Sequence, residues 1–226
     1  MKRTKQLDDL FERWIETYPE EQRSVFHRDG IIDEAKFESQ AYRVLFILLE
    51  PNSKDGRYDR YSGWDLRKVF GEEKLKKELH FNLAIWTRAL LDGATNYIRP
   101  SADTAEEQIR RIALINLKII GGSGKADYEA ISIHAWKDRE FIREEVRIIS
   151  PTVVVTCGNT AHRLFGWVMK DDPYANIPDT VLLYDGITVL PANHPSLRPK
   201  NAQDALARLV QRARESRIAT LKNIGG

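Results

Sequence analysis

The chain has 226 residues, of which 42% are hydrophobic and 30% are charged, and its formal net charge is +2. This length and apolar content suit one domain with a sizeable core. A single cysteine excludes a disulfide framework and any zinc or iron–sulfur site held by several thiolates. No segment is typical of a signal peptide or a membrane span. We therefore expect a cytoplasmic, monomeric protein without a metal, a cofactor or a membrane partner.

The first 40 residues are predicted to form a helical extension. Apolar side chains recur there at helical spacing, at Leu7, Leu10, Phe11, Trp14 and Ile15. Pro19 interrupts the pattern, and Asp29-Gly30 is typical of a turn. We assign residues 1–40 to this N-terminal helical extension and residues 41–226 to an α/β domain.

Four apolar runs further along the chain are typical of strands buried on both faces. They cover residues 42–51, 112–120, 152–160 and 186–192. Helical patterns lie between and after them, over residues 64–92, 101–111, 137–150, 161–169 and 201–221. This alternation predicts an α/β fold with three α/β/α layers around a central, mostly parallel, four-stranded sheet.

In such a fold the ligand site lies beyond the carboxyl ends of the strands. Three of the four predicted strand ends carry groups suited to acid–base or hydrogen-bonding chemistry. The four segments are Glu50-Pro51-Asn52, Asn116-Leu117-Lys118, Cys157-Gly158-Asn159 and Asn193-His194-Pro195-Ser196. We expect the functional site where these segments meet.

The order of these segments resembles the uracil-DNA glycosylase superfamily over roughly residues 40–215. "LLEPN" (48–52) is similar to the strand end that carries motifs such as GQDPY, and "ALINLKI" (113–119) to the strand with a base-reading asparagine. "FIREEVRIISPTVVVTCGNTAHRLFG" (141–166) resembles the following helix, strand and helix, and "LPANHPSLRP" (190–199) the strand that runs into an HPS motif.

The resemblance implies a monofunctional DNA glycosylase. Such an enzyme flips an abnormal, damaged or modified pyrimidine such as uracil out of the duplex and hydrolyses its N-glycosidic bond, leaving an abasic site. The purpose would be DNA repair or defence against modified phage DNA. The excised base, the preference for single or double strands, and the choice between these two purposes stay open.

Positions matching the family motifs take on its roles in this interpretation. Glu50 would orient the attacking water, and His194 would hydrogen-bond the departing base. Asn116 would read the pyrimidine edge, although uracil and cytosine need opposite orientations of its amide. Trp64 would stack on the flipped base. Asn52 replaces a tyrosine that excludes thymine, so a 5-substituted pyrimidine can fit.

Contacts to DNA are expected from polar, basic and wedge-forming residues at the strand ends and nearby loops. Leu197 and Arg198 fall where members of the superfamily insert a wedge into the duplex. The full expected set is Lys118, Ser123, Lys125, Ser196, Leu197, Arg198 and Lys200.

Other function classes compete with this interpretation. One is a non-catalytic nucleic-acid-binding protein on the same fold, and another is a hydrolase of free nucleosides or nucleotides. A third is a Cys157-dependent hydrolase with His194 as its base, although Val155 stands where a nucleophile elbow needs glycine. The "GGSGK" segment (121–125) does not fit a phosphate-binding P-loop, because Ile119 and Ala126 occupy two of the motif's positions.

Overall fold

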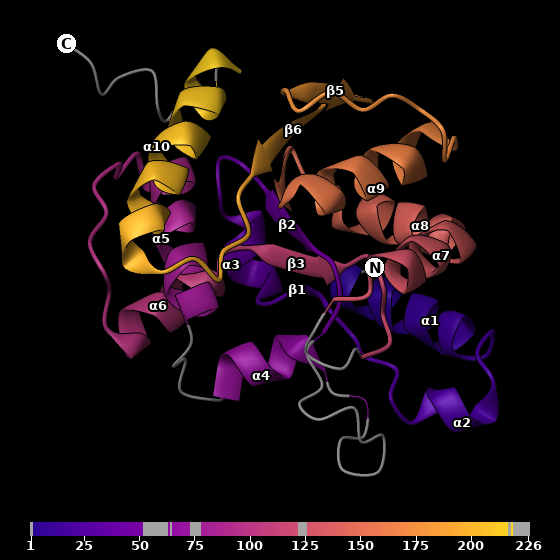
Figure 1. Cartoon of the computed structure of the whole chain (residues 1–226). Coiled ribbons are helices and arrows are strands. Elements are labelled where there is room, and N and C mark those ends of the chain that lie inside the picture. The colour runs from indigo at the N-terminus through magenta and orange to yellow at the C-terminus, as the bar shows by residue number, and fades with distance from the viewer. Residues whose placement is uncertain are drawn as a thin grey trace.

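The structure, a computed structural model, describes residues 2–51, 63, 65–72, 78–121, 126–216 and 218. A six-stranded sheet in the order β1-β3-β2-β4-β6-β5 runs through its centre (Figure 1). The strands are β1 (Gly30–Ile31), β2 (Val44–Leu48), β3 (Ala113–Asn116), β4 (Val153–Cys157), β5 (Leu182–Tyr184) and β6 (Ile187–Ala192).

The α/β class is confirmed, but the prediction of four strands is wrong because the sheet gains one strand at each edge. The four inner strands, β3, β2, β4 and β6, are parallel to one another. The edge strands β1 and β5 pair antiparallel, which makes the sheet mixed. β1 has only two residues, too few for a recognisable pattern. β5 joins β6 through Asp185 and Gly186, whose positive φ values of 47° and 82° suit a tight hairpin.

Helices fill both sides of the sheet. The described part of the chain contains α1 (Arg3–Ile15), α2 (Glu20–Arg23), α3 (Glu34–Glu38), α4 (Leu66–Glu72), α5 (Glu78–Asp92), α6 (Ala102–Ile109), α7 (Tyr128–Lys137), α8 (Arg139–Ile149), α9 (Asn159–Lys170) and α10 (Pro199–Glu215). Helix α7 lies largely outside the predicted helices. It begins where the Asp127 side chain accepts hydrogen bonds from the backbone N–H groups of Glu129 and Ala130, which is an N-cap.

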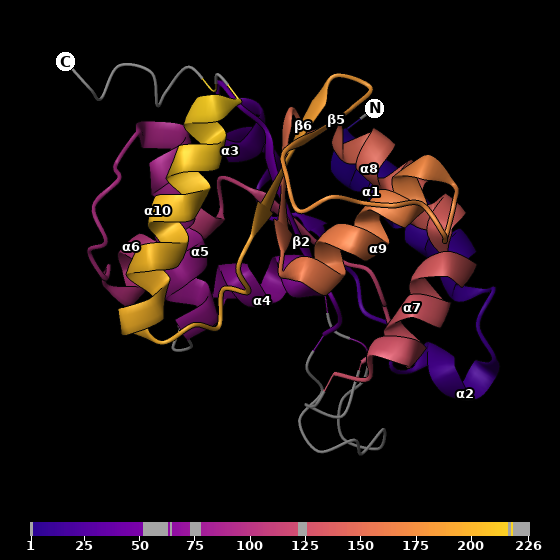
Figure 2. The same cartoon turned by 45° about the horizontal axis from the view of Figure 1, so that its top comes forward.

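The layers are visible with the sheet near edge-on: α5, α6 and α10 lie on one side, and α1, α7, α8 and α9 on the other (Figure 2). Successive residues of β2 alternate between the two sides. Phe46 and Leu48 enter the core under α5 and α10, whereas Leu45 and Ile47 enter the core under α8 and α9. Burial on both faces explains why this strand is apolar at every position.

The first 40 residues share the sheet and the core with the rest of the chain. Helix α1 packs against α8, and Leu7, Phe11 and Trp14 on α1 are fully buried in the core of that side. After α2, the chain returns to the sheet as β1, where Gly30 pairs with Leu114 of β3. This pairing brings the residue before Gly30, which is Asp29, to the carboxyl end of β3.

Candidate functional site

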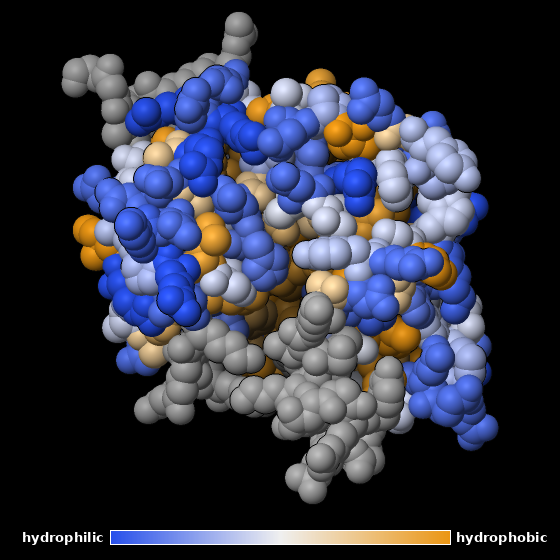
Figure 3. All heavy atoms as spheres, viewed as in Figure 1, coloured by the Kyte–Doolittle hydropathy of each residue, from blue (hydrophilic) through white to orange (hydrophobic). Residues whose placement is uncertain are grey.

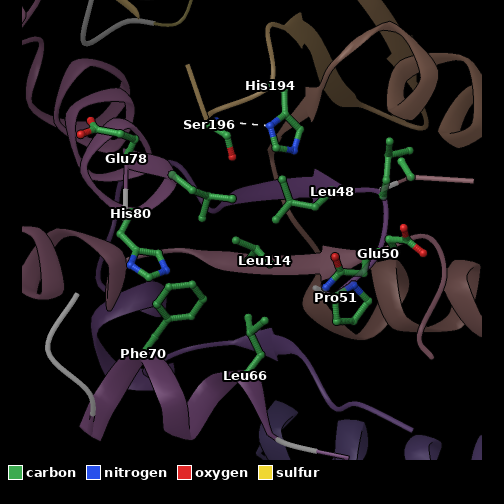
Figure 4. A pocket seen from close by; sticks show the side chains of 14 residues that line it. Leu48, Glu50, Pro51, Leu66, Phe70, Glu78, His80, Leu114, His194 and Ser196 are labelled. Atoms are coloured by element: carbon green, nitrogen blue, oxygen red, sulfur yellow. Dashed lines mark hydrogen bonds between the residues drawn. The ribbon is translucent and has the colours of Figure 1, made fainter. Parts of the chain in front are cut away.

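A cavity of about 490 Å³ lies at the carboxyl ends of the parallel strands. This volume falls within the range of about 300–1,000 Å³ that is typical of small-molecule sites. The face shown in Figure 3 is hollowed, with apolar residues at the bottom of the hollow and hydrophilic side chains on either side. Leu48 of β2 and Leu114 of β3 line the cavity between the two helical layers (Figure 4).

The structure brings together residues from three of the four predicted strand ends. Glu50 follows β2, Asn116 ends β3, and His194 and Ser196 follow β6, and all four line this cavity. The fourth strand end places Gly158 beside the histidine, because a Cβ atom on this glycine would lie 4.0 Å from the His194 Cβ. The carboxyl ends of the parallel strands therefore bring the side chains of these predicted segments to one cavity.

His194 is held as a neutral imidazole with its Nε2 atom protonated. Its Nδ1 atom accepts a hydrogen bond of 3.2 Å from the Ser196 backbone N–H, so in the neutral ring the proton is on Nε2. The ring is exposed at the mouth of the cavity, yet enough protein surrounds it for desolvation to lower the pKa of His194 below 6.5. Figure 4 shows the ring pointing towards Leu48 inside the cavity. The arrangement therefore offers a hydrogen-bond donor to a ligand oxygen.

Asn82, which the sequence analysis did not identify, fixes the segment that follows His194. Its side-chain amide, fully buried on α5, donates to the carbonyl oxygens of Pro195 at 2.7 Å and Leu197 at 2.9 Å. Tyr97 completes the network by donating to the Asn82 Oδ1 atom at 3.1 Å. A buried asparagine inside an apolar helix needs such partners, so this polar residue was a usable signal in the sequence.

Glu50 forms an ion pair with Lys118 at the edge of the cavity. The two strand ends stay together because Lys118 N–H donates to the Leu49 carbonyl oxygen at 2.9 Å. The Lys118 Nζ atom lies 2.6 Å from Glu50 Oε2, and the two side chains are only 9% and 10% exposed. The Lys118 ammonium group is therefore buried and balances the Glu50 carboxylate, which disfavours the predicted contact with a DNA phosphate.

Asn116 is anchored by a second buried carboxyl group, that of Asp29. The backbone N–H of Asn116 donates to Asp29 Oδ2 at 2.7 Å, and its side-chain Nδ2 donates to the same oxygen at 3.1 Å. Asn116 is 1% exposed and Asp29 is fully buried. Asp29 therefore holds a residue that lines the cavity, although its sequence position indicated only a turn.

Asp29 lies next to a further buried carboxyl group, Glu145 of α8. Burial raises the pKa of Asp29 to about 6, although a hydrogen bond from Glu145, hydrogen bonds from Asn116 and the charge of Arg67 oppose this rise. Burial, reinforced by the nearby Asp29 charge, raises the pKa of Glu145 well above its ordinary value. Of the two carboxyl groups, Glu145 therefore holds a proton more strongly, and Asp29 ionises first.

This pair makes the protein less stable as the pH rises. Folding raises the pKa of both carboxyl groups, so the folded protein holds these protons to a higher pH than the unfolded chain does. The resulting contribution to the free energy of unfolding is complete below the ordinary pKa values of 3.8 and 4.5. It is lost as the pH rises through about 6 for Asp29 and through higher values for Glu145. We expect the free energy of unfolding to fall by at most about 1.4 kcal/mol per pH unit for each proton. Urea denaturation at several pH values between about 5 and 8 measures this slope.

The matched variant for this prediction is Glu145→Gln. A glutamine keeps the shape of the protonated side chain and has no proton to lose, so the variant should show a shallower pH dependence than the wild type. An unchanged slope in Glu145→Gln would contradict the assignment of the buried proton to this pair.

The expected DNA-contact residues after His194 divide into two groups. Arg198 and Lys200 are exposed at the start of α10, and Ser196 is exposed at the cavity. Leu197 is half-buried and packs against the core, so it does not project as a free wedge. Asn52, Trp64, Ser123 and Lys125 lie outside the described residues.

The wall opposite His194 comes from α4 and α5, where the sequence analysis assigned no site residue to the described positions. Phe70 meets the ring of His80 edge-on, with 5.2 Å between ring centroids and an interplanar angle of 81° (Figure 4). Leu66 and Leu79 extend this wall. The wall is predominantly apolar, which suits a flat ring more than a charged ligand.

The Cys157 thiol does not have the surroundings of a nucleophile. The side chain is fully buried, and desolvation raises its pKa. A reactive cysteine instead needs partial exposure and an electropositive environment that favours the thiolate. The geometry therefore disfavours the Cys157-dependent hydrolase.

No described helix is both long and apolar enough to cross a membrane. Within the same part of the chain, no cluster of three or more histidine, cysteine, aspartate or glutamate side chains is arranged to hold a metal ion. Comparison with models of known protein families gives no match, and comparison with curated proteins also gives none.

Proposed function

We propose that the protein is a DNA glycosylase that hydrolyses the N-glycosidic bond of an abnormal or modified pyrimidine and leaves an abasic site. The observation that carries this proposal is the convergence of three groups on one cavity: the neutral His194 imidazole, the Glu50 carboxylate and the Asn116 amide. The resemblance of "LLEPN", "ALINLKI" and "LPANHPSLRP" to superfamily motifs supports the same function.

Each group matches one requirement of the reaction. Cleavage of the bond from C1′ to the base nitrogen leaves positive charge on the sugar and negative charge on the base. The His194 Nε2–H would donate to the base oxygen where negative charge grows, and a preorganised donor of this kind contributes about 3–4 kcal/mol in the transition state. Glu50 would orient the water whose oxygen bonds to C1′ and would offset the positive charge of the sugar. The departing base anion gains a proton, and the water loses one.

The shape of the cavity supports a planar base as the bound group. Leu48, Leu114 and Phe70 line it with apolar surface, and Asn116 provides hydrogen-bonding groups at the end of β3. A base can reach this depth only after it leaves the helical stack, at a cost of a few kcal/mol. Arg198 and Lys200 are exposed at the start of α10 and would contact phosphates near the flipped nucleotide.

A second candidate is a nucleic-acid-binding protein without base-release activity. The observation that favours it is the ion pair between Glu50 and Lys118, because the carboxylate charge is already balanced by the protein. The pair uses Glu50 Oε2, so Oε1 is the atom that would have to hold the water. Base release separates the two functions directly.

The experiment is a base-release assay on oligonucleotides that carry uracil, 5-substituted uracils, hypoxanthine, or 5-hydroxymethylcytosine with and without a sugar. We expect release of at least one pyrimidine, with strand breakage at the abasic site only after alkali treatment, because the proposed chemistry has no lyase step. DNA binding without release from any of these substrates would support the second candidate and overturn the glycosylase.

A further inference from the structure

The orientation of the Asn116 amide is fixed by Asp29. A backbone N–H is always a donor, so the hydrogen bond of 2.7 Å from Asn116 N–H identifies Asp29 Oδ2 as an acceptor. The side-chain atom 3.1 Å from that same oxygen must then be a donor, which is Nδ2. The Asn116 Oδ1 atom consequently faces away from Asp29.

This arrangement leaves one acceptor for a ligand. Asn116 lines the cavity, its Oδ1 atom is buried, and no described residue donates a hydrogen bond to it. A buried acceptor without a partner is unfavourable, and a ligand with an N–H group at this position would relieve the penalty. At this position the cavity therefore favours a ligand atom that donates a hydrogen bond over one that accepts it.

Asp29 is itself held firmly in place. The antiparallel pairing of Gly30 with Leu114 positions the backbone next to β3. Gly30 has a φ of 107° and lies against Leu7, since a Cβ atom there would approach the leucine side chain to 2.9 Å. A larger residue cannot take this position without strain, so the chain turns here and directs Asp29 towards Asn116.

We propose that Asp29 is a positioning residue that sets base selectivity, because it makes Asn116 present its Oδ1 atom to the bound base. A site of this kind selects bases with a ring N–H group, such as uracil and 5-substituted uracils, over cytosine and its derivatives. The N3 atom of cytosine is an acceptor and would face Oδ1 with two lone pairs opposed. This proposal rests on the proposed function and resolves the ambiguity of an asparagine, which by itself can read either base.

The test compares Asp29→Ala with Asp29→Asn. Alanine removes the acceptor and frees the Asn116 amide to rotate, so uracil release should fall about 10- to 100-fold and the preference for uracil over cytosine should shrink. The Asp29→Asn variant keeps an oxygen that can accept both hydrogen bonds, and it should retain the preference. Retention of the full wild-type preference in Asp29→Ala would overturn the proposal, because a merely structural role lowers both activities together.

Binding of nucleosides to the full chain provides a readout that does not depend on cleavage. Ligand-observed NMR with deoxyuridine and with deoxycytidine, whose N1 atoms carry the sugar and no hydrogen, should show preferential binding of the uracil base by the wild type and by Asp29→Asn, and loss of that preference in Asp29→Ala. The Asp29→Ser variant replaces Asp29→Ala if the latter does not fold, as judged by circular dichroism. A serine is too short to hold both Asn116 donors, so we expect the same loss.

The two readouts distinguish the two proposals. Preferential uracil binding that depends on Asp29, without base release from any oligonucleotide, would support the selectivity role and overturn the glycosylase. Equal binding of the two nucleosides by the wild type would overturn the selectivity role even where uracil is released. If the wild type neither binds these ligands nor releases a base from any oligonucleotide, both proposals are overturned.

Discussion

Replacing His194 with alanine is expected to lower the rate of base release by about 10²–10³-fold, the usual loss when a preorganised donor to a developing oxyanion is removed. The structure gives a specific reason, since the Ser196 N–H occupies Nδ1 and leaves the Nε2 proton for the ligand. Single-turnover kinetics on the substrate that the wild type cleaves measures the chemical step directly. The histidine ring is exposed, so thermal unfolding of His194→Ala should match that of the wild type.

The pH profile provides an independent check on His194. Desolvation lowers its pKa below 6.5, so the neutral ring persists into mildly acidic solution and the activity should decline only below that value. Protonation of Nδ1 breaks the hydrogen bond from Ser196 and releases the ring from its fixed orientation. This acidic limb should be absent from the residual activity of His194→Ala. If His194→Ala releases base at the wild-type rate and with the wild-type pH profile, His194 has no role in the reaction.

Removing only one charge of the ion pair between Glu50 and Lys118 should strongly destabilise the protein. Lys118→Met leaves the Glu50 carboxylate 10% exposed without its counter-charge, and the free energy of unfolding should fall by about 3–5 kcal/mol. Glu50→Gln should lower the free energy of unfolding by a comparable amount, because it leaves the Lys118 ammonium group buried without its counter-charge. In the double variant neither charge remains, so most of the stability should return. Urea denaturation of the four proteins completes the cycle.

The same four proteins separate the contribution of Glu50 to protein stability from its proposed role in base release. If Glu50 orients the water, the stable double variant should still release base at least about 100-fold more slowly than the wild type. Wild-type release by the double variant would assign Glu50 a purely structural role. Failure of the double variant to regain stability would contradict the paired-charge interpretation of this site.

Much of the fold follows from local patterns in the sequence. Within the run at residues 42–51, Val44–Leu48 are apolar at every position because β2 is buried on both faces, and this pattern predicts the strand directly. The edge strand β5 was missed because Leu182 and Tyr184 are only half-buried and Leu183 is exposed. Helix α7 was missed because its capping residue, Asp127, follows a glycine-rich segment that resembles a loop.

The candidate site could be predicted only in part, for a different reason. Glu50, Asn116 and His194 stand at strand ends, so the geometry of a parallel sheet identifies them. The contribution of Asp29 depends on a hydrogen bond to a residue 87 positions away, which no local pattern encodes. The charge of Lys118 indicated a phosphate contact. In the structure its backbone N–H bonds Leu49, which brings the two strand ends together, and its side chain bonds Glu50.

The hydrogen bonds from Asn82 have a mechanical consequence. They attach the segment after His194 to α5, and α5 also supplies Glu78, Leu79 and His80 to the cavity. These hydrogen bonds therefore couple the segment that carries His194 to the α5 wall of the cavity. Under the proposed function, we expect a substitution along α5 that widens the cavity for a bulkier base to displace His194 as well, and so to lower the rate of base release.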